Sequence, residues 1–306
     1  MEKKAAFLHA PRTPLKVDTA PFNQPGPHEI LIRNHAVAVN PVDYKQQDTG
    51  VQIKSFPCIL GMDIAGTVVE LLSQQKITDK IAFTDVVVLP LGLTTACWGL
   101  FEEGYLEIVA PSASEIPPSE NKEKVALVWG GSSSVGASAV QLLAAGGYTV
   151  LATASSKNFD FVKSLGATHV FDHTDSSIIN QLVEASCGKQ VLGAYDAIGA
   201  DSTARLCVQY LHTLGCGKYM TSLYTTDTGD FPEEVTRVGK SPPPMQGRDG
   251  GAPLWNNVWQ DFMGSGLRND KLRTKPDAFV LEGGLERINE AVDLVRKGVS
   301  AKKAVV

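Results

Sequence analysis

The fold is decided by one stretch, Val125-Ala126-Leu127-Val128-Trp129 followed by Gly130-Gly131-Ser132-Ser133-Ser134-Val135-Gly136. A short apolar run that leads into a glycine-rich turn is typical of a buried strand in a parallel sheet. The apolar segment Ala137–Ala145 follows, and it predicts a helix that ends at Gly146-Gly147. The stretch therefore predicts a strand, turn and helix in which the helix N–H groups face a pyrophosphate.

The same alternation of strand and helix continues along the chain. Further strands are predicted at Tyr148–Ala154, His169–Phe171, Leu192–Ile198 and Tyr219–Leu223, with helices between them at Asn158–Leu165, Ser176–Ser186 and Ser202–His212. Right-handed crossovers between such strands produce a parallel sheet. The predicted class is α/β, a Rossmann-type doubly wound parallel sheet.

The segments on either side of this region do not show the regular alternation of strand and helix. Short β-like runs precede the stretch at Ala5–Leu8, Glu29–Val39 and Ile64–Val69, and an apolar helix is predicted at Leu89–Gly104. Thr225–Pro253 is rich in Gly, Pro and Asp, and we expect a long irregular loop there. Near the end of the chain the sequence again predicts regular elements. They are a strand at Ala278–Leu281, an amphipathic helix at Leu285–Lys297 and a strand at Ala304–Val306.

The glycine-rich turn is the first candidate binding site. Its spacing departs from G-x-G-x-x-G, so the strand–turn–helix context is the stronger argument. A plain βα turn that binds nothing is the alternative. Gly136 is expected to let the helix pack closely on the strand. The candidate cofactor-binding residues are Gly131, Ser132, Ser133, Ser134, Val135 and Gly136.

The end of the second strand points to the choice of cofactor. An NAD site usually has a carboxylate there, which holds the ribose 2′-hydroxyl. This chain has Ser155-Ser156-Lys157-Asn158 instead, two hydroxyls and a cation that suit the 2′-phosphate of NADPH. In the alternative interpretation, these residues only cap the next helix. Two further candidates, Tyr195 and Gly199, lie at the end of a later strand, where a simple turn is an equal alternative.

Composition excludes several classes of protein. The 306 residues are 43% hydrophobic and 20% charged, with a net charge of −5 and no long basic run, so a nucleic-acid or anionic-membrane surface is not expected. No run approaching the ~20 apolar residues of a spanning helix is expected either. The five cysteines are scattered without a C-x-x-C pair. They favour a reduced, cytoplasmic protein without disulfides or structural zinc.

Four segments resemble the zinc-independent branch of the medium-chain dehydrogenase/reductase superfamily. They are Asn40-Pro41-Val42-Asp43-Tyr44-Lys45, Gly61-Met62-Asp63-Ile64-Ala65-Gly66-Thr67-Val68, Leu89-Pro90-Leu91-Gly92-Leu93-Thr94-Thr95-Ala96, and the C-terminal Gly283 to Lys303. The first is similar to the active-site loop of that family. The likeness is greatest to fungal enoyl-reductase-like and quinone-oxidoreductase-like members, including trans-acting enoyl reductases of polyketide synthases.

The resemblance implies two domains and a set of catalytic residues. Residues 1–86 and 265–306 are expected to form a shortened GroES-like catalytic domain, and residues 87–264 a Rossmann NADP-binding domain. The chain is then expected to reduce a C=C bond conjugated to a carbonyl, by hydride transfer from NADPH. The implied catalytic residues, which touch the nicotinamide or stabilise the developing enolate, are Lys45, Asn40, Tyr44, Thr95 and Thr94.

No metal is expected. Zinc members have a cysteine ahead of the active-site loop and a Gly-His-Glu motif, whereas Ala36–Val39 has no cysteine and Met62-Asp63 follow Gly61. The expected partners are a small-molecule or carrier-bound enone and a polyketide synthase. No nucleic acid or membrane is expected, and the chain is expected to be a monomer or a homodimer.

One departure from the family opens a rival interpretation. After Val68-Val69-Glu70 the family continues through several more strands, and this chain lacks several tens of those residues. A specialised protein, a splice form or an error in the gene model would each give this sequence. The rivals to a reductase are a non-redox homologue that binds a polyketide-like ligand or acts as a cyclase or isomerase, and a regulatory NADPH-binding protein.

Overall fold

The computed structural model describes residues 3–21, 30–70, 81–222, 231–239 and 258–306. The chain divides into two compact units, which are described separately. Unit 1 comprises residues 1–91 and 274–306, and unit 2 comprises residues 92–273. The boundaries expected from the sequence follow residues 86 and 264.

Unit 2 is built on a six-stranded sheet in which all neighbouring strands are parallel. The order is β11-β10-β9-β6-β7-β8. The strands are β6 (Lys124–Trp129), β7 (Thr149–Ala154), β8 (His169–Asp172), β9 (Gln190–Asp196), β10 (Gly217–Thr221) and β11 (Val235–Arg237). The doubly wound parallel sheet predicted from the sequence is confirmed.

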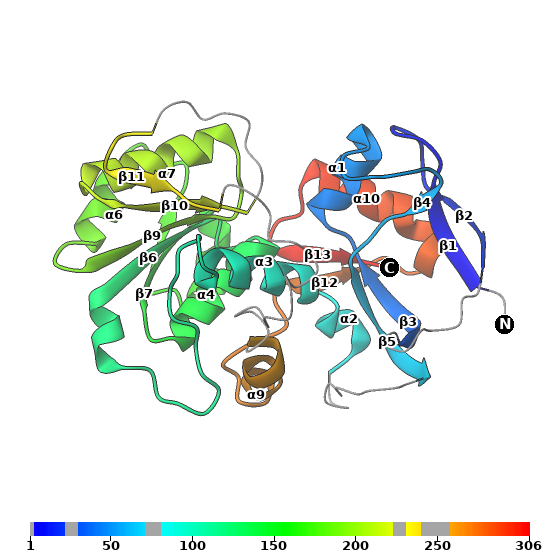
Figure 1. The fold of residues 1–306 in the computed structure, drawn as a ribbon, viewed down its shortest axis with the longest axis horizontal. Helices are drawn as coiled ribbons and strands as arrows, with labels where there is room; N and C mark the ends of the chain where they lie inside the picture. Colours follow the sequence, from blue (N-terminus) through cyan, green and yellow to red (C-terminus); the bar gives the residue numbers. More distant parts are fainter. Residues whose placement is uncertain (1–2, 22–29, 71–80, 223–230, 240–257) are drawn as a thin grey trace. The chain divides into compact units, whose positions relative to one another are not determined.

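Helices cover both faces of this sheet (Figure 1). Alternate residues of β6 show the two layers, because Ala126 and Val128 belong to one core cluster and Val125 and Leu127 to the other. The helices are α3 (Pro90–Phe101), α4 (Ser134–Ala145) and α5 (Phe159–Ser164) on the first face, and α6 (Ile178–Ala185) and α7 (Asp201–Thr213) on the second. Unit 2 also contains η1 (Ser119–Glu123), η2 (Ser156–Asn158), the π-helical turn η3 (Val258–Met263) and α9 (Gly264–Arg268).

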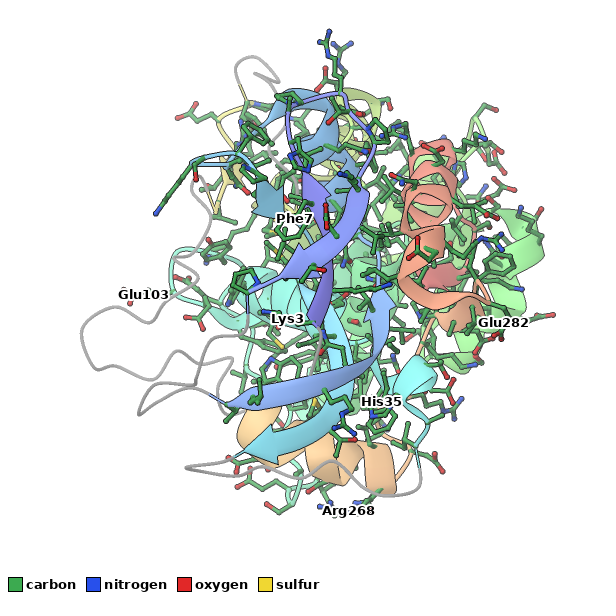
Figure 2. The ribbon with its side chains drawn as sticks, turned by 90° about the vertical axis from the view of Figure 1, so that its right-hand side faces the viewer. Lys3, Phe7, His35, Glu103, Arg268 and Glu282 are labelled. Carbon is green, nitrogen blue, oxygen red and sulfur yellow. The ribbon has the colours of Figure 1, made fainter. Side chains whose placement is uncertain are left out.

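Unit 1 contains two small sheets. One has the order β2-β1-β4, with strands Lys16–Ala20, Lys3–Leu8 and Cys58–Ile59, and the other the order β12-β13-β3-β5, with strands Asp277–Val280, Lys302–Val305, Leu31–Ala38 and Asp63–Glu70. Figure 2 shows Lys3 and Phe7 on β1 and His35 on β3. The helical segments are α1 (Pro41–Thr49), α2 (Phe83–Val86), η4 (Gly284–Arg287) and α10 (Ile288–Lys297). Segments from both ends of the chain share one apolar core, which includes Leu8 and Ala291.

Two expectations about local structure were wrong. The segment expected to be an active-site loop is the N-terminus of helix α1, since Asn40 has extended N-cap geometry and Pro41 occupies the first turn, where its missing N–H is not needed. Within the irregular loop expected at 225–253, Val235–Arg237 pairs with β10. Residues 225–230 and 240–253 of that loop lie outside the described residues.

One helical segment corrects a further expectation. Phe83–Phe101, which spans α2 and α3, is apolar enough and, at 19 residues, long enough to cross a membrane by length and composition. However, 56% of its apolar 18-residue window is buried inside the protein. A buried core helix has the same composition, so the segment by itself is weak evidence for a membrane span.

Candidate functional site

The glycine-rich turn of unit 2 joins β6 to the N-terminus of α4. Ser133 is the N-cap, and its hydroxyl accepts a hydrogen bond from the Gly136 N–H at 3.0 Å. A Cβ on Gly136 would lie 2.2 Å from the Gly130 carbonyl oxygen, so only glycine lets the helix approach the strand end this closely. The first N–H groups of a helix have no partner within it and attract anions. The turn is therefore the candidate phosphate-binding site of unit 2.

The start of α3 packs directly against this turn. A Cβ on Gly92 would lie 2.7 Å from the Ser134 hydroxyl oxygen and 3.1 Å from its carbonyl oxygen. The predicted residues Thr94 and Thr95 follow within the same helical turn of α3. Thr94 and Thr95 thus lie two and three positions after a residue that contacts the predicted phosphate turn, although the turn begins 35 positions after Thr95 in sequence.

The candidates at the end of β7 lie beside the same turn. The Asn158 amide donates a hydrogen bond to the Ser132 hydroxyl at 3.4 Å, which connects the two predicted segments. Lys157 is exposed on η2 and makes no ion pair within the described part of the chain. Ser155 lies 3.3 Å from the His173 ring, measured between Oγ and Nε2. A free cation and two hydroxyls thus lie at the edge where the ribose of a dinucleotide is expected.

Sequence reasoning missed an acidic residue at the same edge. Asp172 is the register partner of Ala154 on the neighbouring strand β8. Hydrogen bonds from Thr174 lower the pKa of its carboxyl group, which therefore stays ionised. The signal was available, since Asp172 directly follows the predicted strand His169–Phe171. Its carboxylate is the group that opposes a preference for a 2′-phosphate.

The strand-end candidates Tyr195 and Gly199 lie in different environments. Tyr195 is fully buried, and its hydroxyl donates to the Thr95 carbonyl oxygen at 3.0 Å. The Gly199 N–H donates to Asp196 at 3.0 Å in the loop after β9. Tyr195 therefore supports α3 from inside the core, while Gly199 belongs to the loop at the carboxyl end of the sheet.

Asp196 organises that loop, a role that sequence reasoning did not assign. Its carboxylate accepts hydrogen bonds from the N–H groups of Ile198 and Gly199 and from the hydroxyls of Thr203 and Tyr219, at 2.7 to 3.2 Å. Burial raises its pKa, against the lowering effect of these hydrogen bonds. All four donors are neutral, so the loop is fixed without a cation.

The remaining catalytic candidates lie on α1 of unit 1. Lys45 is half-buried, and its ammonium has no ion-pair partner among the described residues. The Tyr44 ring packs on the core of unit 1, with the Arg296 guanidinium carbon 5.8 Å from its centroid. Tyr44 is held by packing, whereas the Lys45 ammonium is available to a ligand as far as the described residues show.

Asn40 belongs to a buried polar network that the sequence did not reveal. Its amide nitrogen donates to Asp63 on β5 at 2.8 Å, and its amide oxygen accepts from Lys303 on β13. Lys303 also pairs with Asp63 at 3.1 Å, and the second Asp63 oxygen accepts from the Leu91 N–H at 2.7 Å. Asn40 is only 2% exposed. Its contacts are those of a residue that positions α1 and the start of α3.

Asp43 lies next to this network and is incompletely satisfied. One carboxylate oxygen accepts from the Asn40 N–H at 2.7 Å, whereas the other is buried without a hydrogen-bond partner. Burial is the main cause that raises the pKa of Asp43 to about 6. The nearby Asp63 carboxylate raises it further, and Lys303 lowers it.

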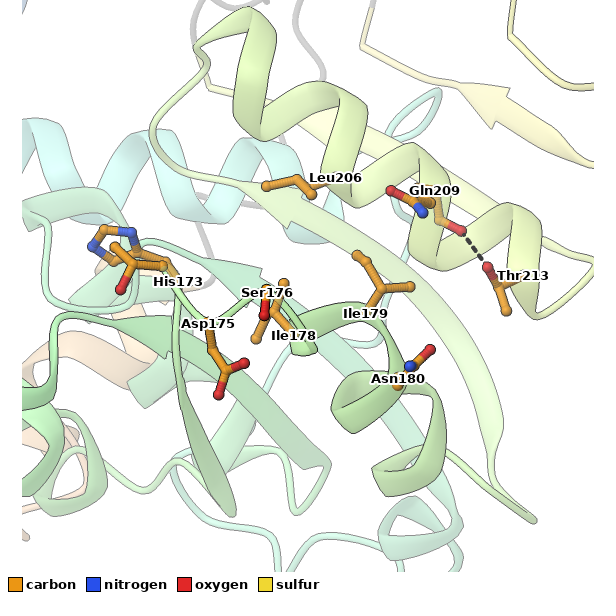
Figure 3. Close-up of a pocket in the computed structure, with 10 residues that line it drawn as sticks. His173, Asp175, Ser176, Ile178, Ile179, Asn180, Leu206, Gln209 and Thr213 are labelled. Atoms are coloured by element: carbon orange, nitrogen blue, oxygen red, sulfur yellow. Dashed lines mark hydrogen bonds between the residues drawn. The ribbon is translucent and has the colours of Figure 1, made fainter.

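Neither a metal-binding cluster nor the cavity described below coincides with the candidate cofactor site, within the described residues. Within the described segments no group of three or more His, Cys, Asp or Glu side chains is placed to hold a metal ion. A shallow cavity of about 490 Å³ lies between α6 and α7 (Figure 3). Its lining includes His173 and Gln209 but none of the residues predicted to bind the cofactor.

Family comparisons agree with both units. Residues 26–113 match the alcohol dehydrogenase GroES-like domain, and residues 134–232 match the zinc-binding dehydrogenase family. The quinone oxidoreductase structure of Pseudomonas syringae pv. Tomato DC3000 superposes with a TM-score of 0.71, covering 100% of both chains at 17% identity. At that identity the structural likeness shows the fold alone.

Curated relatives are more similar in sequence. The trans-enoyl reductase himH of Aspergillus japonicus is 35% identical over 320 residues, covering 91% of this chain and 89% of that protein. The dehydrogenase orsE of Emericella nidulans is 31% identical over 352 residues, covering 99% of this chain and 98% of that protein. Since this chain has 306 residues, at least 46 positions of the second alignment have no residue in it. The chain belongs to the zinc-binding dehydrogenase, GroES-like family of the medium-chain dehydrogenase/reductase superfamily.

Proposed function

We propose that this chain is an NADPH-dependent, zinc-independent reductase of a C=C bond conjugated to a carbonyl group. The observation that carries the proposal is the edge of unit 2 that holds the Gly130–Gly136 turn, the N-terminus of α4 and Lys157, which has no ion-pair partner in the described part of the chain. Helix N–H groups and a free cation fit the two phosphate positions of NADPH. The likeness to enzymes named trans-enoyl reductase supports the choice of reaction.

The chemistry divides between the cofactor and the protein. When bound, NADPH supplies a hydride to the β-carbon of the enone, leaving NADP⁺ and an enolate that takes a proton at the α-carbon. The chain's own task is to donate hydrogen bonds or positive charge to the carbonyl oxygen, on which negative charge develops. The candidates with available groups are the Lys45 ammonium and the Thr94 and Thr95 hydroxyls, and Asn40 positions the helix that holds Lys45.

The proposed substrate is a hydrophobic enone, free or held as a carrier-bound thioester, in fungal polyketide metabolism. The enoyl substrate is supported by the relatives named trans-enoyl reductase, and the link to polyketides is supported by the family resemblance of the sequence. The proposed partner is accordingly a polyketide synthase, and the proposed location is the cytoplasm. Zinc independence is supported by Met62 and Asp63 at the positions of the family's His-Glu pair.

The experiment measures NADPH oxidation by the purified full chain with a panel of enones and quinones, and identifies the product. We expect the saturated ketone with one NADP⁺ per product, an undiminished rate after exhaustive chelation, and little turnover with NADH. Stoichiometric zinc whose removal abolishes turnover would contradict zinc independence. Absence of NADPH binding would overturn the whole proposal.

The shortened chain favours one rival. At least 46 positions of the alignment with orsE have no residue here. The sequence pattern after Glu70 assigns the missing residues to the catalytic domain, and their loss favours a protein that binds ligand without redox turnover. Product analysis without NADPH separates this rival. A cyclised or isomerised product formed in the absence of NADPH supports the rival, and a saturated product formed only with NADPH supports the reductase.

A further inference from the structure

The π-helical turn η3 lies beside α3 within unit 2. Val258 and Phe262 anchor η3, since each is only 1% exposed and belongs to the same core cluster as Leu93 and Ala96 of α3. Trp259, between the two anchors, is half-buried. Isolated π-helical turns are rare and are frequent at functional sites. The η3 turn therefore holds the Trp259 side chain next to α3.

Among the residues that the structure describes, Trp259 makes one polar contact, to a residue already predicted to be catalytic. Its indole Nε1 donates to the Thr94 hydroxyl oxygen at 3.2 Å. An indole nitrogen is a donor only, so Thr94 must be the acceptor in this hydrogen bond. The Thr94 hydroxyl proton is then directed elsewhere.

Other helical threonines of this chain show the usual alternative. Thr49 and Thr213 donate their hydroxyl protons to the carbonyl oxygens four residues earlier, at 2.7 and 2.8 Å. Thr94 makes no such bond, and no described residue accepts its proton. Its hydroxyl is thus held as an acceptor on one side and left as a donor on the other.

We propose that Trp259 is a positioning residue, which orients the Thr94 hydroxyl so that its proton is donated to the carbonyl oxygen of the enone substrate. This inference rests on the proposed reductase function and deepens it. A hydrogen bond to that oxygen strengthens as the enolate forms. Loss of the orientation therefore lowers kcat more than it raises KM. In the structural alternative, the indole only fills space in the core.

The test is a double-mutant cycle on the full chain with NADPH and an enone. Trp259→Phe removes the indole N–H and keeps an aromatic ring, and Thr94→Val removes the hydroxyl. Since one hydrogen bond has a net value of about 0.5–1.5 kcal/mol, we expect Trp259→Phe to lower kcat about 3- to 10-fold, with unchanged NADPH affinity. In the Thr94→Val background the same change should have no further effect. In the Thr94→Ser variant, which keeps a hydroxyl, Trp259→Phe should again lower kcat.

The chain offers a matched control at Trp98, on the same helix as Thr94. Its indole nitrogen is buried without a hydrogen-bond partner, so Trp98→Phe removes the same group without breaking a bond. We expect wild-type kcat from this variant. The inference would be overturned if Trp259→Phe lowered kcat equally in the wild-type protein and in the Thr94→Val variant, or if it lowered NADPH affinity. Either result would leave the reductase proposal intact. A wild-type protein that binds NADPH but reduces no enone would instead overturn the proposed function, and this inference with it.

Discussion

Each unit contains a fully buried aspartate, and the two are satisfied in different ways. Asp63 in unit 1 is paired with the buried cation Lys303 and accepts from the Asn40 amide and the Leu91 N–H. Asp196 in unit 2 accepts from two backbone N–H groups and two hydroxyls, and no cation of the described residues pairs with it. Unit 1 therefore uses an ion pair where unit 2 uses neutral donors.

The difference shows how each unit uses its charged groups. In unit 1 the Lys303 charge connects segments 263 residues apart, because the same ammonium reaches Asn40. In unit 2 the loop after β9 is held by neutral donors, and Lys157 at the carboxyl edge of the sheet has no ion-pair partner among the described residues. We interpret the first lysine as structural and the second as a ligand-binding group.

The largest expected effect comes from breaking the buried pair in unit 1. Lys303→Met leaves the Asp63 charge buried and unpaired, and we expect a loss of about 3–5 kcal/mol in the free energy of unfolding. Urea denaturation measures it. Lys302→Met, at an exposed position of the same strand, is the control and should change stability by roughly 0.5 kcal/mol or less. If the double variant Asp63→Asn with Lys303→Met is no more stable than Lys303→Met alone, the ion-pair account is wrong.

The second effect concerns the exposed lysine of unit 2. Lys157→Ala should weaken NADPH binding about tenfold or more, because a charge-assisted hydrogen bond is worth about 1.5–3 kcal/mol, and should leave NADH binding unchanged. Calorimetric titration with both cofactors measures this. Lys163→Ala, which removes an exposed lysine of α5, serves as the control. Equal losses for the two cofactors would remove the assignment of Lys157 to the 2′-phosphate.

The third effect concerns the neutral hydrogen-bond donors that surround Asp196 in unit 2. Asp196→Asn keeps the shape of the side chain but replaces one acceptor oxygen by a donor that faces existing donors. We expect a loss of about 1–2 kcal/mol in the free energy of unfolding, smaller than that of Lys303→Met. Thermal and urea denaturation of both variants give the comparison. A loss as large as that of Lys303→Met would show that the two aspartates are equally dependent on charge.

The smallest effect is a pH dependence in unit 1. The folded pKa of Asp43 is about 6, above the ordinary aspartate pKa of 3.8, so the folded state binds this proton more tightly than the unfolded chain. Its contribution therefore favours the folded state at low pH, and that stabilisation is lost as the pH rises from about 4 to about 6. We expect the stability of Asp43→Asn relative to wild type to rise by roughly 1 kcal/mol or more across this interval. A difference that stays constant from pH 4 to pH 7 would contradict the raised pKa.

Local patterns predicted most of unit 2 correctly. The strand before Gly130, the Ser133–Gly136 turn and the helix after it depend on neighbouring residues, so periodicity and glycine placement were sufficient. The short strand Val235–Arg237 was missed, since it lies between Gly- and Pro-rich segments that suggested a loop. Helix α1 was missed because the segment from Asn40 to Lys45 was expected to be a loop from its resemblance to the family, although proline also fits the first turn of a helix.

Long-range polar contacts could not be predicted from such patterns. Lys303 resembles its neighbour Lys302 in sequence, and only the fold shows that one is buried against Asp63 and the other is exposed. The Trp259–Thr94 hydrogen bond likewise joins residues 165 positions apart. Family resemblance pointed to Thr94 and Asn40, but their hydrogen-bond partners became visible only in the structure.

The proposed reaction is hydride transfer from NADPH to an activated C=C bond. The most direct measurement uses NADPH with deuterium at the transferable C4 position and locates the label in the product by NMR. We predict one deuterium at the β-carbon of the saturated ketone, with the α-carbon proton derived from solvent. A saturated product without deuterium at the β-carbon, or product formed equally well without NADPH, would contradict the claim.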